Sequence, residues 1–338
     1  MTLLNNSADT PVATAVPTAA PVPAPDVPQT GQGAAGKLTP AVRREKALLR
    51  FAVSITVLNV LGHLFLGFEQ SPITPIATVL TAYGVALVLE YVDSRAYDRA
   101  PEYAGGPRAV LMFLLPAHIA ALACAMLLWG SSVLWPYLLA TTVAVASKYI
   151  VRLRLDGRLR HVLNPSNTGI VVVLLLFPWV GIAPPYHFTN ATTGAIDWLL
   201  PLAILGLGTM LNAKLTGKIP LISGWLAGFV IQAVVRWLLL DHSLIAALLP
   251  ATGLAFILFT NYMITDPGST PVRPAAQVGF GLTTAAVYGL LVVNGVVFGL
   301  FFALVATCLL RAVVLWSSSR MPAVRRRTSD PATVGATV

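Results

Sequence analysis

Charged residues are scarce in this chain, and their scarcity excludes an ordinary soluble protein. Of 338 residues, only 10% are Asp, Glu, Lys or Arg, whereas 56% are hydrophobic and the mean hydropathy is +0.77. Soluble domains carry roughly 25% charged residues. We therefore expect an integral membrane protein. The net charge of +9 does not indicate nucleic-acid binding, because the Lys and Arg residues stand in the gaps between apolar segments.

The sequence also lacks the motifs of most enzyme classes. Cys124 and Cys308 lie far apart inside apolar segments, which excludes closely spaced disulfide, zinc and iron–sulfur motifs and predicts two buried thiols. There is no Walker loop, dinucleotide-binding glycine run, Ser-His-Asp array or paired metal-binding histidine motif. No carboxylate falls at mid-membrane depth, and His63 and His118 are expected to be neutral and hydrogen-bonded to neighbouring helices. We assign no catalytic residue and no metal ligand.

Ten apolar segments approach the roughly 20 residues that a membrane crossing requires. They cover residues 48–68, 72–92, 107–129, 131–150, 163–183, 197–216, 218–240, 243–263, 275–295 and 296–316. Gaps that contain Lys or Arg alternate with gaps that contain none, so the positive-inside rule predicts that both termini are cytoplasmic. Only Arg236 departs from this pattern, and we expect it to pair with Asp241 or to extend to the membrane surface.

The predicted organisation follows from these segments. Residues 1–42 form a Pro/Ala-rich cytoplasmic tail that is expected to be disordered, residues 43–318 a ten-helix transmembrane domain, and residues 319–338 a basic cytoplasmic tail. Ten crossings are typical of a five-plus-five inverted repeat. Arg outnumbers Lys 17 to 5, which favours a bacterial source and hence a bacterial cytoplasmic (inner) membrane. We interpret four glycines as sites of close helix packing: Gly206, Gly208, Gly224 and Gly228.

Two polar, helix-breaking runs, residues 160–169 and 265–271, adjoin apolar segments. Irregular backbone survives near a membrane only where it is packed in protein or lines a cavity, so the two runs predict a built site. They are four crossings apart and are therefore expected on the same, cytoplasmic side. The predicted site residues are Lys148, Arg160, Asn164, Pro165, Asn167, Thr168, Gly169, Thr265, Asp266, Pro267 and Thr270.

The side chains of the runs have a binding interpretation and a structural one. The amides and hydroxyls of the first run can recognise the edge of an isoalloxazine or quinone ring, and Lys148 can face an anionic group or a flavin carbonyl. The structural alternatives are that Lys148 extends to the membrane surface and that Asn167 caps the fifth span. Asp266 can equally cap the ninth span or pair with Arg273 or Arg160.

Around these runs the sequence resembles the NqrB/RnfD family, the large membrane flavoprotein subunits of the sodium-pumping NADH:quinone reductase and of the Rnf electron-transport complex. The resemblance spans about residues 145–275, and its motifs lie at residues 147–149, 157–158, 163–169, 177–178, 218–220, 223–224 and 261–267. It implies a ten-helix fold related to urea-transporter-like channels, with flavins in and beside the membrane.

The resemblance also bears on how a flavin would be held. Many members esterify FMN to the threonine of a Ser-Gly-Ala-Thr motif, and here residues 193–196 read Thr-Gly-Ala-Ile, so Ile196 takes the acceptor position. A hydrocarbon side chain cannot form a phosphoester, so covalent FMN is not expected unless Thr192 or Thr193 substitutes. Noncovalent riboflavin or FMN is the expected form. The Pro/Ala tail and the missing acceptor suit a stand-alone subset of the family that resembles proteins associated with enediyne biosynthesis.

The leading expectation is thus a membrane electron-transport subunit, an oxidoreductase component without its own NADH site. Its expected partners are the lipid bilayer and other membrane or redox proteins that donate or accept electrons, and not nucleic acid. The main alternative is a transporter or channel on the same scaffold that has lost its flavins. A third hypothesis is an assembly scaffold that acts through the tail of residues 1–40.

Overall fold

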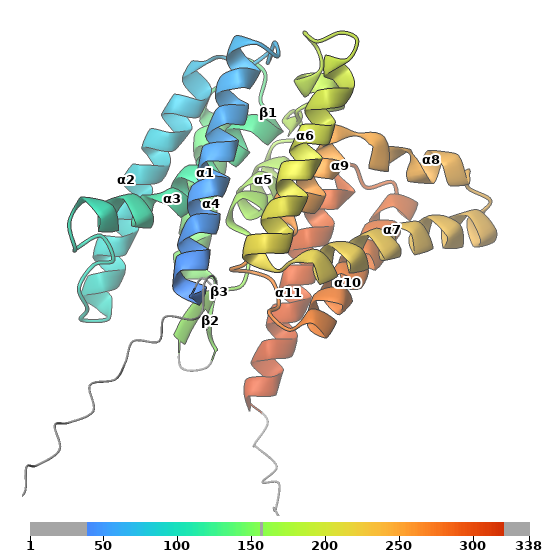
Figure 1. The fold of residues 1–338 in the computed structure, drawn as a ribbon. Helices are drawn as coiled ribbons and strands as arrows, with labels where there is room; N and C mark the ends of the chain where they lie inside the picture. Colours follow the sequence, from blue (N-terminus) through green and yellow to red (C-terminus); the bar gives the residue numbers. More distant parts are fainter. Residues whose placement is uncertain (1–38, 156–157, 321–338) are drawn as a thin grey trace, which may run out of the picture. The chain divides into compact units, whose positions relative to one another are not determined.

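The computed structural model describes residues 39–155 and 158–320. The chain divides into two units, residues 1–38 and 39–338, and the description concerns the second. The predicted tails, 1–42 and 319–338, therefore fall almost wholly outside the described residues. The long helices are α1 (Pro40–Leu64), α2 (Ile73–Ala96), α3 (Pro107–Leu127), α6 (Ile196–Leu211), α7 (Ile219–Leu240), α10 (Pro274–Val293) and α11 (Gly299–Arg320) (Figure 1).

Shorter elements connect and complete this helical unit. The short α-helices are α4 (Trp135–Ile150), α5 (Pro165–Leu176), α8 (Leu244–Leu248) and α9 (Leu254–Leu258). The 3-10 helices are η1 (Pro185–Phe188) and η3 (Leu249–Thr252), and the π-helices are η2 (Asn212–Thr216) and η4 (Phe259–Met263). The strands are β1 (Leu128–Trp129), β2 (Arg152–Leu155), β3 (Arg158–His161) and β4 (Gly181–Ile182), which pair antiparallel as β1–β4 and β2–β3.

Among the residues that the structure describes, seven helices are long and apolar enough to cross a membrane. An eighth crossing is counted if α8–η3 and α9–η4, which meet at a 68° bend, form one broken span. The expectation of a largely helical, multi-pass membrane protein is confirmed. Each of the ten predicted segments overlaps a helix or this bent pair, but two of the helices are too short to count as spans by length.

The two short helices are α4, with 16 residues, and α5, with 12. At 1.5 Å per residue, α5 is only about 18 Å long, against a hydrocarbon core of about 30 Å. It ends at Phe177 because Pro178, which follows, disfavours the helical conformation of the residue before it. The predicted segments 131–150 and 163–183 are therefore longer than the helices within them.

Proline marks the beginnings of the helices. It stands in the first turn of α1, α3, α4, α5, α7 and α10. The first backbone N–H groups of a helix have no partner within it, so a residue that lacks an N–H costs nothing there. The apolar residues that follow form the buried faces of these helices, so each buried face begins just after the proline.

Glycine brings α7 and α10 into backbone contact. A Cβ on Gly224 would lie 2.5 Å from the carbonyl oxygen of Val278, and one on Gly281 would lie 2.4 Å from the backbone nitrogen of Trp225. Gly208 and Gly228 likewise have neighbours at 2.7 Å and 2.6 Å, so three of the four packing glycines are confirmed. Gly206 is not a packing site, since a Cβ there would meet nothing within 4 Å.

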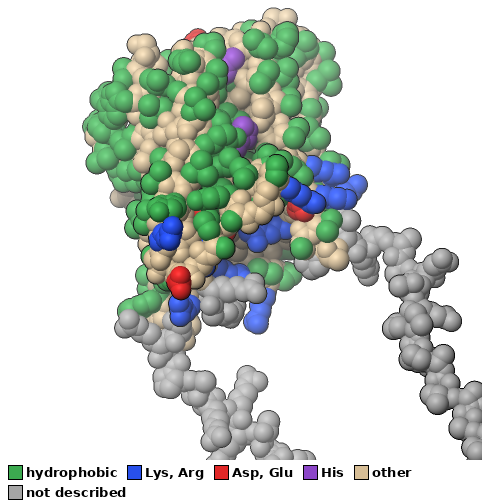
Figure 2. Space-filling model, turned by 90° about the vertical axis from the view of Figure 1, so that its left-hand side faces the viewer, with side chains coloured by type: hydrophobic (Ala, Val, Ile, Leu, Met, Phe, Trp, Pro, Cys, Tyr) green, Lys and Arg blue, Asp and Glu red, His purple; other side chains and the backbone are tan. Residues whose placement is uncertain are grey.

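One end of the helical unit gathers the basic loops. The start of α1, the β2–β3 hairpin and the end of α11 all lie toward the lower end of Figure 1. Figure 2 shows Lys and Arg side chains grouped toward this end, below a broad hydrophobic surface. We call it the basic end.

A buried ionic cluster joins elements of the basic end. Glu90 in α2 is only 1% exposed, and its carboxylate accepts hydrogen bonds from both terminal nitrogens of Arg99, at 2.6 and 3.1 Å. Asp93 accepts from Arg99 and from Arg152 of β2. Because the carboxylates favour the charged guanidinium, the pKa of Arg99 is raised, with Glu90 contributing most. The cluster fastens the hairpin to α2.

The opposite end is joined by neutral contacts. Gln70 donates from Nε2 to the carbonyl of Leu128, and the rings of Phe68 and His187 stack with centroids 3.5 Å apart. Both predicted intramembrane histidines are hydrogen-bonded, but only His118 bonds to neighbouring helices as expected. His118 contacts Thr56 and Tyr83 on neighbouring helices, whereas His63 contacts the carbonyl of Asn59 within its own helix.

Candidate functional site

The first polar run ends in the N-cap of α5. Asn164 Oδ1 accepts hydrogen bonds from the backbone N–H of Asn167 at 3.0 Å and from Ser166 Oγ at 3.1 Å. Pro165 is the first residue of the helix, and Thr168 Oγ1 donates to the Asn164 carbonyl at 2.6 Å. Asn164, and not Asn167, is therefore the capping residue, which corrects the structural alternative predicted for Asn167.

Deeper in the run, α5 is packed tightly against α4 and α11. A Cβ on Gly169 would lie 2.0 Å from the carbonyl oxygen of Ala140 in α4, so only glycine permits this approach. Asn167 is fully buried and donates from Nδ2 to the carbonyl of Phe301 in α11 at 2.9 Å. Its Oδ1 has no hydrogen-bond partner among the described residues. Gly169 and Asn167 thus place α5 between its neighbours.

The second run folds on itself. Asp266 Oδ2 accepts from the backbone N–H of Ser269 at 2.9 Å and from its hydroxyl at 2.7 Å. The hydroxyls of Thr265 and Thr270 donate to the carbonyls of Asn261 and Asp266. The exposed Pro267 lies in the turn and has no N–H to donate. These bonds stabilise a compact turn just after η4.

The two runs meet at a junction of two contacts. Asn164 Nδ2 donates to the carbonyl of Met263 at 2.9 Å, and His161 Nε2 lies 3.9 Å from Asp266 Oδ2. A Cβ on Gly268 would lie only 2.1 Å from His161 Nε2, so the imidazole rests directly on the second run. We call the residues 160–169 and 263–271, with the side chains that contact them, the junction. The sequence predicted that the two runs face the same side, and they are in contact.

Two cations outside the runs bind the second run's backbone. Lys218, at the start of α7, donates from Nζ to the carbonyl of Pro271 at 2.8 Å, and Arg311 of α11 donates to the carbonyl of Ser269 at 2.9 Å. Lys218 is 3% exposed, and this burial lowers its pKa to about 8 although Asp266 acts in the opposite direction. Burial also lowers the pKa of His161, again against Asp266.

Two predicted site cations remain without partners among the residues that the structure describes. Lys148 lies half-buried in the last turn of α4, where the charges of Glu102 and Asp266 act on it, and no hydrogen bond or ion pair involves its ammonium. Arg160 is exposed on β3, opposite Leu153. The junction therefore presents unpaired positive charge, and this is the chemistry suited to an anionic group.

The predicted roles of Asp266 are both corrected. It caps its own turn instead of the ninth span, whose N-cap residue is Arg273 without a side-chain hydrogen bond. The side-chain nitrogen within ion-pair distance of the Asp266 carboxylate belongs to His161, and not to Arg273 or Arg160. Sequence reasoning gave no role to Ser269 or Arg311, and only the folded contacts identify them. The expected partner of Arg236 is also different: it contacts His242, and no ion pair with Asp241 is present in the described part of the chain.

The two buried thiols lie against the first run. Both cysteines are 0% exposed, as expected. Cys124 Sγ in α3 lies 3.8 Å from the carbonyl oxygen of Ser166, and the thiol of Cys308 in α11 contacts the backbone of Asn164 and the side chain of Ser269. The thiols therefore report on the packing of the junction.

The junction residues suit the phosphate of a flavin nucleotide better than its ring. Of the first-run groups predicted to recognise the ring, those of Asn164, Ser166 and Thr168 are bonded to the protein itself, and Asn167 keeps an Oδ1 without a partner among the described residues. The hydroxyls of Thr265 and Thr270, in the second run, are also bonded to the protein. Lys148 and Arg160 are free to bind a phosphate. Cavities of about 380 and 280 Å³ are present among the described residues, and neither of these two is lined by the runs. The unpaired cations of the junction suit the anionic part of FMN, whereas most of its amide and hydroxyl groups are already bonded to the protein.

The outer threonines of the covalent-flavin hypothesis lie elsewhere. Thr192 donates to Asp197 and to the carbonyl of Thr189, whereas Thr193 is exposed. Ile196 is exposed at the first turn of α6. The side chain at position 196 is thus accessible, and it carries no oxygen that could form an ester.

These features define a multi-pass helical membrane protein with a cationic junction at its basic end. No family model and no curated protein matches the chain.

Proposed function

We propose that this protein is a membrane electron-transport subunit of the NqrB/RnfD type, which binds a flavin noncovalently at the junction. The observation that carries the proposal is the meeting of two separated polar runs beside the unpaired cations Lys148 and Arg160. FMN supplies a phosphate for these cations and a ring that takes up and releases electrons. The sequence contains no NADH-binding motif, so a separate redox protein is the proposed electron donor, and a second protein or a quinone is the acceptor.

The proposal includes a topology. In it, all ten predicted segments cross the membrane in a five-plus-five, urea-transporter-like arrangement, with the short α4 and α5 buried inside the bundle. The basic end lies in the cytoplasm of a bacterium, as the distribution of Lys and Arg favours. The contacts between the basic gaps, such as Arg152 with Asp93 and Lys218 with the 265–271 run, support their common side.

The cofactor is proposed to be noncovalent. Ile196 occupies the expected acceptor position, and its side chain offers no oxygen for a phosphoester. FMN is favoured over riboflavin, because riboflavin has no phosphate with which Lys148 and Arg160 could pair.

The test is an absorption spectrum of the detergent-purified full chain, followed by acid precipitation. Isoalloxazine absorption that is released into the supernatant is the expected result. Lys148→Gln should lower the amount of bound flavin, while Lys214→Gln, which removes an exposed lysine from η2, should not. A folded protein without colour, which also fails to bind added FMN, would overturn the proposal. Colour that remains in the pellet would overturn its noncovalent part.

A transporter is the second candidate, and the bent pair α8–η3 and α9–η4 favours it. Broken helices that meet at a sharp angle are a common way to build a substrate site in transporters. This hypothesis predicts solute flux in proteoliposomes of colourless protein, and the flux should depend on residues at the bend. Absence of flux in a flavin-loaded preparation would favour the redox function instead.

A further inference from the structure

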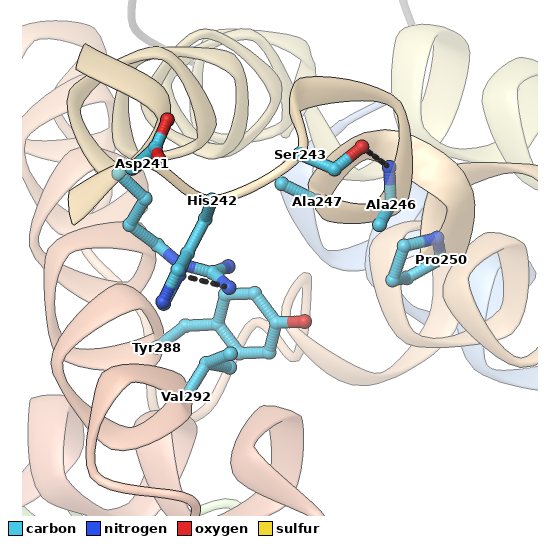
Figure 3. A pocket seen from close by; sticks show the side chains of 9 residues that line it. Asp241, His242, Ser243, Ala246, Ala247, Pro250, Tyr288 and Val292 are labelled. Carbon is cyan, nitrogen blue, oxygen red and sulfur yellow. Dashed lines mark hydrogen bonds between the residues drawn. The ribbon is translucent and has the colours of Figure 1, made fainter.

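A second candidate site lies at the far end of α7 from the junction. α7 has 22 residues and is therefore about 33 Å long. Beyond its last turn, a cavity of about 380 Å³ opens between α7, α8 and α10 (Figure 3). It is lined by Arg236, Asp241, His242, Ser243, Ala246, Ala247, Pro250, Tyr288 and Val292. Its volume falls in the range of about 300–1,000 Å³ typical of ligand pockets.

The guanidinium of Arg236 is incompletely bonded. An arginine has five N–H donors. Among the described residues the hydrogen bond of this side chain is the one from Nη2 to His242 Nδ1, at 3.3 Å, and its buried Nε has no partner. A buried donor without an acceptor costs about 1–3 kcal/mol. Asp241 also lines the cavity, but it forms no ion pair with Arg236 in the described part of the chain, and its side chain turns away from Tyr288 in Figure 3.

Apart from Asp241, the other polar side chains of the cavity can also donate hydrogen bonds. His242 Nδ1 accepts from Arg236, so in the neutral imidazole the proton is on Nε2, which can donate. Ser243 Oγ accepts from the backbone N–H of Ala246 at 3.3 Å, which leaves its hydroxyl proton for a ligand. Tyr288 of α10 and His242 point into the same space. A lining with several donors and an arginine that forms no ion pair among the described residues favours an anion with several acceptor oxygens.

The surroundings of the cavity indicate where such an anion comes from. Exposed apolar side chains flank it on α7, α8 and η3: Trp237, Leu238, Leu239, Ile245 and Leu249. In the topology proposed above, this is one end of a membrane-spanning helix, where lipid headgroups meet the protein. An arginine in such a position can pair with the phosphate of a headgroup.

We propose that this cavity binds a phosphate group, with Arg236 as the principal ligand and His242, Ser243 and Tyr288 as additional donors. The phosphate is carried by an anionic lipid or is present as free phosphate. A phosphate oxygen accepts from the buried Nε and a terminal nitrogen of Arg236 together, which satisfies the donor that the protein leaves open.

The test uses the full chain in a neutral detergent and three probes: short-chain phosphatidic acid, short-chain phosphatidylcholine and inorganic phosphate. We expect phosphatidic acid to bind, and Arg236→Gln to weaken its binding about 10-fold to 100-fold, since a charge-assisted hydrogen-bond pair is lost. Arg273→Gln, which removes an exposed arginine at the basic end, should leave binding unchanged. Tighter binding of the lipid than of inorganic phosphate identifies a lipid site, and equal binding identifies a free-phosphate site.

Some results would overturn the proposal. Equal affinity for phosphatidic acid and phosphatidylcholine would refute selection of an anion. An unchanged affinity in Arg236→Gln, or an equal loss in Arg273→Gln, would refute the assigned site. If Arg236→Gln does not fold, Arg236→Lys decides, because it keeps the charge but loses the paired nitrogens. It should bind phosphatidic acid several-fold more weakly, and wild-type affinity in this variant would contradict the proposal.

Discussion

Asn164 makes two separate contributions to the junction, and different substitutions can remove one or both of them. Its Oδ1 caps α5, and its Nδ2 bonds to the carbonyl of Met263, 99 residues away in sequence. Asn164→Ser keeps an oxygen that can cap the helix but loses the bond to Met263. Asn164→Ala loses both. The carbonyl of Met263 still accepts a longer bond, at 3.4 Å, from the N–H of Asp266, so the loss in the serine variant is moderate.

The expected magnitudes follow from these bonds. Loss of one hydrogen bond costs about 1 kcal/mol, and loss of an N-cap costs about another 1 kcal/mol. The serine variant should therefore be destabilised by about 1 kcal/mol and the alanine variant by about 2 kcal/mol. We call the junction open when the two runs have separated. The values correspond to roughly 5-fold and 30-fold increases in the population of molecules with an open junction.

The chain's own thiols supply the assay. Cys124 and Cys308 are its two cysteines, and both are buried against the 164–166 segment. The rate at which these thiols react with a fluorogenic maleimide is measured under conditions in which it is proportional to the fraction of molecules with an open junction. This rate should rise roughly 5-fold in the serine variant and roughly 30-fold in the alanine variant. Asn294→Ala is the matched control, because Asn294 also donates to a carbonyl, that of Leu290, but is exposed. Equal labelling of Asn164→Ala and this control would refute the assigned role of Asn164.

Three further predictions concern packing and pH. Gly169→Ala should destabilise the protein by about 1–3 kcal/mol, because its methyl would meet a backbone carbonyl at 2.0 Å, whereas Gly206→Ala should not; thiol labelling checks both. Burial lowers the pKa of His187 to about 4. The unfolded chain therefore binds more protons below pH 6.5, and wild type should lose about 2 kcal/mol between pH 7 and 5 relative to His187→Gln in denaturant titrations. The pKa of Lys218 is lowered to about 8. The unfolded chain holds its proton up to about pH 10.5, so wild type should gain about 2 kcal/mol relative to Lys218→Met between pH 7 and 9.5, and a difference that does not change with pH would contradict this burial effect.

The helices were predictable from the sequence because apolar length and proline position depend on local residues. Pro165 and Pro178 bracket α5, and a shorter helix could have been predicted from them. The extent of α4 and α5 was overestimated because apolar residues extend past the helix ends. Hydropathy measures the chemistry of a segment and not the conformation of its backbone.

The site was only partly predictable, for a different reason. The polar residues of the two runs indicated that their side chains must form hydrogen bonds, but not with which partners. Asn164 bonds to Met263 and Arg311 bonds to the carbonyl of Ser269, and these contacts exist only once distant segments are packed together. The same amide can recognise a ligand or cap a helix, and sequence alone does not distinguish the two. Lys148 and Arg160 are predicted site residues whose side chains have no partner in the part of the chain that the structure describes.

The glycine contacts between α7 and α10 have a mechanical consequence. Where Gly224 and Gly281 meet the opposing backbone, there is no side chain that could change rotamer to let one helix slide past the other. If one helix slid along the other, their backbone atoms would collide. The two helices therefore rotate or tilt only together, as a rigid unit. Any movement of the protein must then be taken up elsewhere, and Gly253, between the two arms of the 68° bend, is the natural hinge.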